Sequence, residues 1–316
     1  MHARIGVIAN PRSHAHRAGR AGLDAVLLRY PDIAYASPAD PVGLQEALRR
    51  FAASGVDLLV VSGGDGTLRH VLSALPDCYP GAPPRLAILA AGNTNLAARV
   101  LGSPGRGMRG LERLLVAARA GTLRHRSCAI LQVSWVDEPD RQAVRGFLLG
   151  AAAFVDGKRI ADAVIHRRGM HDALAVAATL ALTVRRMLFP RPGRGAGTRM
   201  QIGLDGHAPR EGHRFLLLAT TLHRLLFGLW PFWGAGPGAI HLLEIDAPPR
   251  RAAAALFAVL RRRPAPWMAA AGYRSARAGE VRLVLQRPFV LDGERFEPGP
   301  HGVLLSAPDT ATVVFP

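Results

Sequence analysis

Short runs of consecutive apolar residues alternate with amphipathic stretches in the first third of the chain. Ile5–Ala9, Leu58–Ser62 and Leu86–Ala90 are continuous and bounded by turn residues, which is typical of strands buried on both faces. Helices are predicted between and after these strands, at Leu44–Ala53, Leu96–Leu101 and Leu111–Ala120. This alternation predicts an open, mainly parallel α/β sheet.

The pattern changes near residue 122. A helix-rich stretch from Val155 to Leu188 ends in a segment rich in Pro and Gly, Phe189–Gly197, and one further helix is predicted at Arg251–Arg262. The other elements are short strand candidates, which predict a mainly β second domain. They are Ala129–Val133, Gly146–Leu149, Met200–Leu204, Phe215–Thr220, Ile240–Ile245, Val281–Leu285, Phe289–Leu291, Val303–Leu305 and Thr312–Phe315.

The segment Ser62-Gly-Gly-Asp-Gly-Thr67 lies where a buried strand ends and a helix begins. Ligands of open α/β sheets bind at the carboxyl ends of strands, where glycines let the backbone approach a phosphate and a helix N-terminus offers unpaired N–H groups. Neither the P-loop nor the dinucleotide fingerprint fits. Asp65 would repel a phosphate, so a metal ion or a cation is expected between them. The alternative is an Asp-Gly turn that only caps its helix.

Two other strand ends carry polar residues, Asn10 with Ser13 and Gly92-Asn93-Thr94-Asn95. Their uncharged donors suit ribose or phosphate oxygens, although the second group alone could be a helix cap. Three such ends at one edge of a sheet indicate a nucleotide site. The candidate nucleotide-binding residues are Asn10, Ser13, Ser37, Gly63, Gly64, Asp65, Gly66, Thr67, Gly92, Asn93, Thr94 and Asn95.

These three turns resemble the catalytic domain of the diacylglycerol kinase family, which includes sphingosine kinases and bacterial soluble lipid kinases and is distantly similar to NAD kinases. The tail from Pro288 to Phe315 resembles the closing segment of that family. The resemblance implies two domains with the active site in the cleft between them. Residues 1–122, with 290–316 returning to them, would form a nucleotide-binding α/β domain, and residues 123–289 a β-sandwich for the lipid substrate.

The activity implied by the resemblance is transfer of the γ-phosphoryl group of ATP to a hydroxyl of diacylglycerol or a related lipid. Asp292 matches the general base, Glu294 stands beside it, and Asp65 would hold Mg²⁺ through the Mg-nucleotide. ATP and Mg²⁺ are thus the expected cofactors. From the residues alone, Leu291-Asp-Gly-Glu294 is a hairpin turn.

The chain departs from the family at three positions that are usually acidic. Leu96 follows Asn95, Arg126-Ser127-Cys128 opens the first strand after the boundary, and Gly236-Pro237-Gly238 replaces a turn that helps to bind a structural Mg²⁺. Two alternatives therefore stand beside the lipid kinase. One is a nucleotide-binding member with weak or no turnover, and the other is an NAD kinase-like small-molecule kinase.

Composition narrows the class of protein. Of 316 residues, 49% are apolar, which excludes a disordered chain. Two cysteines, Cys78 and Cys128, cannot form a disulfide framework and fit a reducing cytosol. The chain opens directly into an apolar strand, so we expect no signal peptide, and its longest apolar run, Ala173–Val184, is too short to span a bilayer.

The formal net charge of +17 reflects either coding bias or an anionic partner. We expect a cytoplasmic protein, peripheral to the inner face of the membrane, that binds a nucleotide and a lipid, forms a homodimer as one option, and does not bind nucleic acid. Arg185–Arg194, with Leu188 and Phe189, is the first candidate for membrane contact. The Trp230–Trp233 segment is the second, with a place in the core as its alternative.

Overall fold

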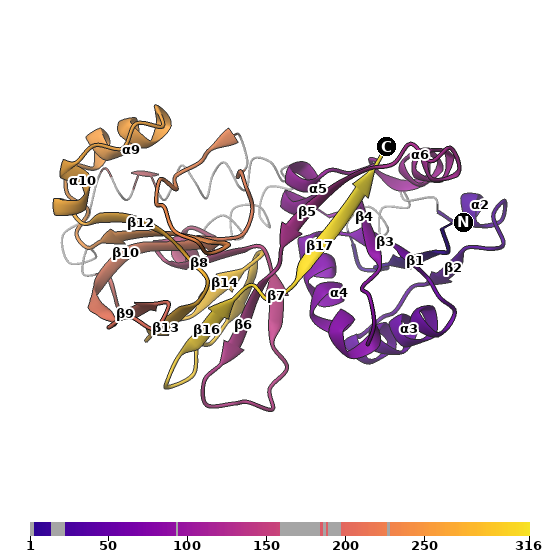
Figure 1. Cartoon of the computed structure of the whole chain (residues 1–316), viewed down its shortest axis with the longest axis horizontal. Coiled ribbons are helices and arrows are strands. Elements are labelled where there is room, and N and C mark those ends of the chain that lie inside the picture. Colours follow the sequence, from indigo (N-terminus) through magenta and orange to yellow (C-terminus); the bar gives the residue numbers. More distant parts are fainter. Residues whose placement is uncertain are drawn as a thin grey trace. The chain divides into compact units, whose positions relative to one another are not determined.

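The computed structural model of the chain describes residues 3–13, 23–92, 94–158, 184–185, 188, 197–225 and 228–316, without the side chains of Asp24 and Ala25. The chain separates into two compact units, drawn in Figure 1. The first unit comprises Met1–Cys128 together with Asp309–Pro316, and the second comprises Ala129–Pro308.

The first unit contains a sheet of the α/β class. Its strands are β1 (Ile5–Ala9), β2 (Ala34–Ala36), β3 (Leu58–Gly63), β4 (Arg85–Ala90), β5 (Arg124–Ala129) and β17 (Thr310–Phe315). Their order is β2-β1-β3-β4-β17-β5, and the pairs from β2 to β17 are parallel. The C-terminal strand β17, yellow in Figure 1, thus lies between β4 and β5.

Helices follow the strands as the sequence pattern predicts. They are α2 (Asp24–Leu27), α3 (Pro41–Ala53), α4 (Asp65–Cys78), α5 (Leu96–Leu101) and α6 (Gly107–Arg119). Asp40 caps α3, since its carboxylate accepts the N–H of Gly43, and Pro41 fits the first turn because that turn needs no N–H. Buried leucines of α6, such as Leu111 and Leu114, pack with β1, β3 and β4 in one core cluster.

The second unit is built on antiparallel strands. They are β6 (Leu131–Trp135), β7 (Val144–Gly146), β8 (Leu148–Ala152), β9 (Thr198–Leu204), β10 (Arg210–Thr220), β11 (Ile240–Asp246), β12 (Tyr273–Ala278), β13 (Val281–Leu285), β14 (Phe289–Leu291), β15 (Glu294–Phe296) and β16 (Val303–Ser306). The order is β15-β14-β8-β10-β9-β13-β16-β6-β7, and β11 joins β10 to β12. All described strands of the unit belong to one hydrogen-bonded sheet, which curls around a core drawn from both ends of this order.

Two short helices, α9 (Ala252–Leu260) and α10 (Trp267–Ala270), lie at one end of this unit beside β12 (Figure 1). A second core cluster joins them to β10, β11 and β12. Phe232 is buried in this cluster, and Trp230 and Trp233 pack against it. The Trp230–Trp233 segment therefore belongs to the core, which was the alternative to lipid contact, because its rings pack on one another and on His241.

The predicted fold class is confirmed as an α/β unit with a mainly parallel sheet and a mainly β unit. The predicted boundaries are wrong at two places. Residues 123–128 belong to the first unit because β5 joins its sheet. Residues 290–308 belong to the second unit, because β14 pairs with β8 and β15, and β16 pairs with β6 and β13. Only β17 returns to the first unit.

Several predicted elements lie partly or wholly outside the described residues. Of the helix-rich stretch Val155–Leu188, residues 153–158 are helical and residues 159–183 are not described. The candidate membrane segment Arg185–Arg194 and the loop Phe189–Gly197 also fall mostly outside. In the part of the chain that the structure describes, no helix is both long and apolar enough to cross a membrane.

Candidate functional site

The order of the strands in the first sheet reverses between β1 and β3. Strand β2 pairs with one edge of β1, and the next strand, β3, pairs with the other edge. The carboxyl ends of β1 and β3 therefore mark a topological switch point. Asn10 follows β1 there, and its N–H donates to the carbonyl of Ser62 on β3 (3.0 Å). The switch point therefore lies at the first two predicted turns.

Asn10 links these two turns through its side chain. Its Nδ2 donates to Thr67 Oγ1 (2.8 Å) in the first turn of α4, and its Oδ1 accepts the N–H of Arg12 (2.8 Å). The buried hydroxyl of Ser13 has no hydrogen-bond partner among the described residues. Ser37 is exposed and follows β2 at the same edge.

The glycines of the second and third turns bring two backbones together. The N–H of Ala91 donates to the carbonyl of Gly63 (3.0 Å). A Cβ on Gly92 would lie 2.3 Å from the Cα of Gly64, and a Cβ on Gly63 would lie 2.5 Å from Thr67. These distances are shorter than any real Cβ contact, so glycine is required at these positions for the loops to touch.

Asp65 ties the same two loops together. Its Oδ2 accepts the N–H of Leu96 (3.0 Å) and its Oδ1 the N–H of Ala97 (3.1 Å), so it caps α5, a helix that starts 31 residues later. Burial raises the pKa of Asp65, against the lowering effect of these backbone bonds and of the Arg99 charge. The N–H groups of α5 thus stabilise the negative charge of Asp65. They reduce the repulsion between Asp65 and a phosphate, which was the reason to expect a cation beside it.

The turn before α5 is closed on itself. Asn95 has a left-handed backbone (φ 50°), and its side chain accepts the N–H of Gly92 (3.0 Å) and donates to the Gly92 carbonyl (2.6 Å). The amide of Asn95 therefore shapes the turn. Thr94 is half-buried beside it, and Asn93 lies outside the described residues.

The residues present fit a magnesium ion only as part of a nucleotide complex. Among the described residues, no group of three His, Cys, Asp or Glu side chains could hold a metal. The carboxylate of Asp65 has roughly four lone-pair sites, and it accepts hydrogen bonds from the backbone N–H groups of Asn95, Leu96 and Ala97. The remaining sites suit a Mg²⁺ that is held mainly by phosphate oxygens and water, as is usual for this ion.

Asp292 forms a tight hairpin turn in the second unit. Asp292 (φ 44°) and Gly293 (φ 89°) are both left-handed, as a two-residue turn between β14 and β15 requires. The carboxylate accepts two N–H groups, from Phe147 at Oδ2 and from Leu148 at Oδ1 (both 2.9 Å). A Cβ on Gly146 would lie 2.4 Å from Oδ2, so this glycine admits the carboxylate. Glu294 begins β15 and is half-buried.

The same arrangement occurs a second time in this unit. Asp205 (φ 48°) and Gly206 (φ 76°) form another turn, and Oδ1 of Asp205 accepts the N–H groups of Gly279 and Glu280 (both 2.8 Å). The geometry of Asp292 is therefore also what a structural Asp-Gly turn produces. This twin turn provides a matched control for any catalytic role of Asp292.

Sequence reasoning gave no role to Lys158, the single lysine of the chain. Its Cε lies 3.6 Å from the position of a Cβ on Gly293, so its side chain runs along the Asp292-Gly293 turn. The sequence does carry one signal for it, because Lys158 is the single lysine among 40 basic residues. A preference for arginine codons does not explain why one lysine remains. An ammonium group near a carboxylate turn also suits a phosphate.

The positions that depart from the family have structural partners. Arg126 Nη1 donates to the carbonyl of Val100 (2.5 Å) at the end of α5, where a cation is favourable. A Cβ on Gly238 would lie 1.7 Å from the carbonyl carbon of Ala278 on β12. The Gly236-Pro237-Gly238 segment thus packs its backbone directly against β12.

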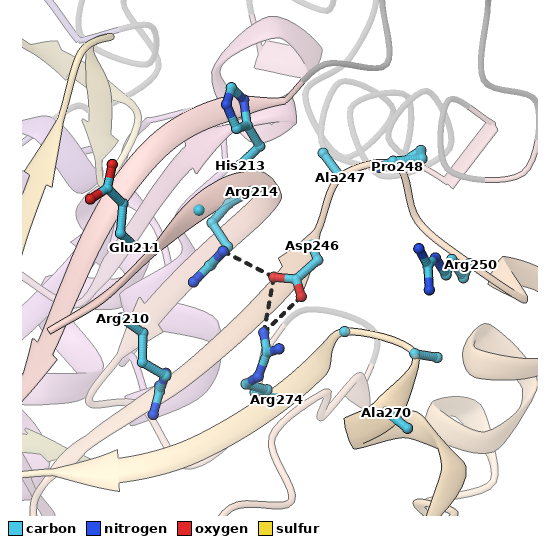
Figure 2. A pocket seen from close by; sticks show the side chains of 13 residues that line it. Arg210, Glu211, His213, Arg214, Asp246, Ala247, Pro248, Arg250, Ala270 and Arg274 are labelled. Atoms are coloured by element: carbon cyan, nitrogen blue, oxygen red, sulfur yellow. Dashed lines mark hydrogen bonds and ion pairs between the residues drawn. The ribbon is translucent and has the colours of Figure 1, made fainter.

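A cavity of about 590 Å³ lies elsewhere in the second unit (Figure 2). Asp246 stands at its centre and receives Arg214 Nη1 (3.0 Å) and Arg274 Nη1 (2.9 Å). Arg214 Nε also contacts the buried Glu244 (3.2 Å). None of the predicted site residues lines this cavity, and three of its four arginines, Arg210, Arg214 and Arg274, are already paired with carboxylates.

The part of the chain that contains the switch-point loops is similar to a known protein family. Residues 4–125 match the family model of the diacylglycerol kinase catalytic domain. The resemblance to the diacylglycerol kinase family is therefore confirmed over residues 4–125. The matched region contains all three loops described above, and it ends within β5. The sequence matches none of the curated proteins.

Solved structures from Bacillus anthracis str. Sterne have the same fold over the whole chain. Two are of a candidate diacylglycerol kinase, with TM-scores of 0.65 and 0.64 at 15% and 16% identity, covering 100% of this chain and 98% and 97% of theirs. A third, described as a diacylglycerol kinase, has a TM-score of 0.59 at 14% identity and covers 100% of this chain and 97% of its own. The likeness in fold thus extends beyond residues 4–125 to the second unit. The match over residues 4–125 supports a phosphotransferase that uses a nucleotide.

Proposed function

We propose that this protein is a kinase of the diacylglycerol kinase family, which transfers the γ-phosphoryl group of ATP to a hydroxyl group of diacylglycerol or a related lipid. The observation that carries the proposal is the family match over residues 4–125, whose glycine-rich loop lies at the switch point of a parallel sheet. Such crevices are where nucleotides bind in this class of sheet.

The nucleotide phosphates would be bound mainly by backbone groups. The side chains of Asp65 and Asn95 are committed to the loop structure, as their hydrogen bonds show. The first turn of α4 offers N–H groups without intrahelical acceptors, next to Gly64 and Thr67. When bound with the nucleotide, Mg²⁺ would neutralise charge that develops on the phosphates.

Asp292 would act as the general base. In the proposed step, a carboxylate oxygen of Asp292 accepts the proton of the lipid hydroxyl while the hydroxyl oxygen bonds to the γ-phosphorus. The bond from the γ-phosphorus to the bridging oxygen breaks, and ADP leaves with that electron pair. The N–H groups of Phe147 and Leu148 hold the carboxylate in one orientation and leave it lone pairs for the proton.

Transfer from γ-labelled ATP to a panel of lipids tests this proposal. The panel contains diacylglycerol, monoacylglycerol, ceramide and a sphingoid base, each with Mg²⁺ or Mn²⁺. We expect phosphate transfer to at least one lipid, a loss of about 10²–10⁴-fold in Asp292→Asn, and little change in Asp205→Asn. Transfer to none of the lipids would overturn the lipid kinase.

Lys158→Met provides a second probe of the same turn. Since the side chain of Lys158 runs beside Gly293, removal of its charge should weaken transfer without unfolding the unit. Transfer by Lys158→Met at the wild-type rate would exclude the lysine from the reaction. Circular dichroism of the variant checks that the fold is intact.

Two alternatives are proposed beside the lipid kinase, a nucleotide-binding member with little turnover and an NAD kinase-like enzyme. Leu96 and Arg126 stand where the family is usually acidic, and both have structural contacts, which favours a nucleotide-binding member with little turnover. A thermal shift with Mg·ATP and no transfer to any acceptor would support it. NAD is added to the panel as an acceptor, which tests the NAD kinase-like alternative.

We further propose that the protein is cytoplasmic and meets its lipid at the inner face of the membrane, where the net charge of +17 favours anionic lipid. A homodimer is proposed as one state of assembly. Cell fractionation at low and high salt tests the first proposal, since screening should release the protein. Light scattering of the purified protein tests the second.

A further inference from the structure

Helix α9 is apolar on all sides but only one side is covered. Its sequence, Ala-Ala-Ala-Ala-Leu-Phe-Ala-Val-Leu, contains no polar residue. Ala252, Ala255, Ala258 and Val259 face the second core cluster. A helix that is apolar all round is normally buried, so the open side of α9 indicates a further contact.

The uncovered side of α9 forms a continuous stripe. Ala253, Ala254, Phe257 and Leu260 recur at helical spacing and are all exposed. Phe257 is 55% exposed and Leu260 is 56% exposed, which are among the largest values for apolar side chains among the described residues. Large apolar side chains in one exposed row mark an interaction site more often than scattered ones do.

Arginines flank this stripe at both ends. Arg250 and Arg251 precede α9 and Arg261, Arg262 and Arg263 follow it, and all five are exposed. From Ala247 to Gly279 the sequence contains seven arginines and no Asp or Glu. We call the stripe and its five arginines the α9 surface.

The apolar and cationic groups of the α9 surface touch one another. The guanidinium of Arg261 lies over the ring of Phe257 (4.1 Å to the centroid), and that of Arg251 lies over the ring of Trp267 on α10 (5.0 Å). Such pairs place charge at the edge of an apolar surface, as an interface between hydrocarbon and phosphate requires.

Charge distinguishes between the partners that could cover this surface. A second copy would bring five arginines against five, and like charges across an interface disfavour pairing. Nucleic acid would match the arginines but leave Phe257 and Leu260 against phosphates. An anionic bilayer satisfies both, because the stripe enters the acyl boundary while the arginines remain among the headgroup phosphates.

We propose that the α9 surface docks the protein on an anionic phospholipid bilayer. This is a contact outside the switch-point loops and the Asp292 turn, and it needs no phosphoryl transfer. Docking places Phe257 and Leu260 in the outer part of the bilayer and the five arginines at the headgroups.

Sedimentation with vesicles tests the proposal. Vesicles of phosphatidylcholine with and without phosphatidylglycerol are mixed with the full chain, and binding is measured against lipid concentration. We expect binding only to the anionic vesicles and release near 1 M salt, where the screening length falls to about 3 Å. Replacing Arg261, Arg262 and Arg263 with Gln should raise the lipid concentration for half-binding by about 100-fold, at roughly fivefold for each arginine.

A second variant tests the apolar half. Phe257→Ser with Leu260→Ser should weaken binding at least about tenfold, because both side chains leave the hydrocarbon. Both residues are more than half exposed, so the fold should survive. Matched controls are Val116→Ser, an exposed apolar residue on α6, and Arg49→Gln with Arg50→Gln on α3, all of which should bind as wild type.

Three results would overturn the proposal. They are failure of the wild type to sediment with anionic vesicles at low salt, unchanged binding by both α9 variants, and equal losses in the control variants. Concentration-dependent self-association that the α9 variants abolish would assign the surface to a second copy instead. Phosphoryl transfer to a short-chain, water-soluble lipid should be the same in wild type and α9 variants, so loss of docking and failure of the kinase proposal are separable.

Discussion

The contact between the loops at Gly64 and Gly92 makes a sharp prediction. Gly92→Ala places a methyl group 2.3 Å from the Cα of Gly64 and 3.1 Å from its nitrogen. Both are backbone atoms, so no side chain can swing aside. Neither glycine has a left-handed backbone, so alanine is strained only by this contact.

The cost follows from what must move. Overpacking of this kind costs about 1–3 kcal/mol, and separation of the loops also weakens the capping bonds from Asp65 to α5, at about 1 kcal/mol each. We expect Gly92→Ala to lower the free energy of unfolding by about 3 kcal/mol. Gly64→Ala should cost about 1 kcal/mol, since its Cβ would stop 3.0 Å from the Cα of Gly92.

Thermal unfolding followed by far-ultraviolet circular dichroism measures the effect, because the long helices α3, α4 and α6 belong to the first unit. At this size, about 3 kcal/mol corresponds to a Tm lower by roughly 10 °C. Gly81→Ala is the control, because nothing lies within 4 Å of its Cβ. It should be neutral or slightly stabilising, by up to about 1 kcal/mol.

The order of the three variants is the critical result. If Gly92→Ala were as stable as Gly81→Ala, the two loops would not be in contact. The hydrogen bonds by which Asp65 caps α5 would then be refuted as well, because they need the same approach of the loops. If Gly64→Ala cost more than Gly92→Ala, the approach of the loops would differ from the one described.

Two further predictions concern the second unit. Burial raises the pKa of Tyr273 to about 12, so the folded state binds the phenolic proton more tightly. Stability should therefore be complete below about pH 10 and fall by about 2 kcal/mol towards pH 12; Tyr273→Phe, followed by tryptophan fluorescence, should remove that decline. Glu244→Gln should cost about 3 kcal/mol in denaturant unfolding, because buried Glu244 pairs with Arg214, whereas exposed Glu297→Gln should cost less than about 0.5 kcal/mol. An equal cost for both glutamates would refute the buried pair.

Elements with a continuous apolar signal could be predicted from the sequence to the residue. Ile5–Ala9 and Phe289–Leu291 are such strands, and both are bounded by polar or turn residues. The strand Tyr273–Ala278 was not predicted, and of the strand Arg124–Ala129 only the part from Arg126 was. Each lies at an end of its hydrogen-bonded array, where few side chains are buried, so arginine and serine replace the apolar pattern.

The candidate site could be predicted only as far as local chemistry extends. The three loops and the Asp292-Gly293 turn are visible in the sequence because strand ends and turn residues mark them. The partners of Asp65 lie 31 and 32 residues away, and those of Asp292 lie about 145 residues away. No local pattern encodes such pairs, since they depend on how the strands are ordered.

The position of β17 between β4 and β5 has a consequence for synthesis on the ribosome. The second unit is one continuous segment, Ala129–Pro308, so it can fold as soon as it has emerged. The sheet of the first unit stays incomplete until β17 arrives, although more than a hundred of its residues were made first. Until then β4 presents an open edge, which is a site for aggregation. Loss of residues 309–316 should therefore destabilise the part of the chain that is made first, because β4 and β5 would lose the strand that lies between them.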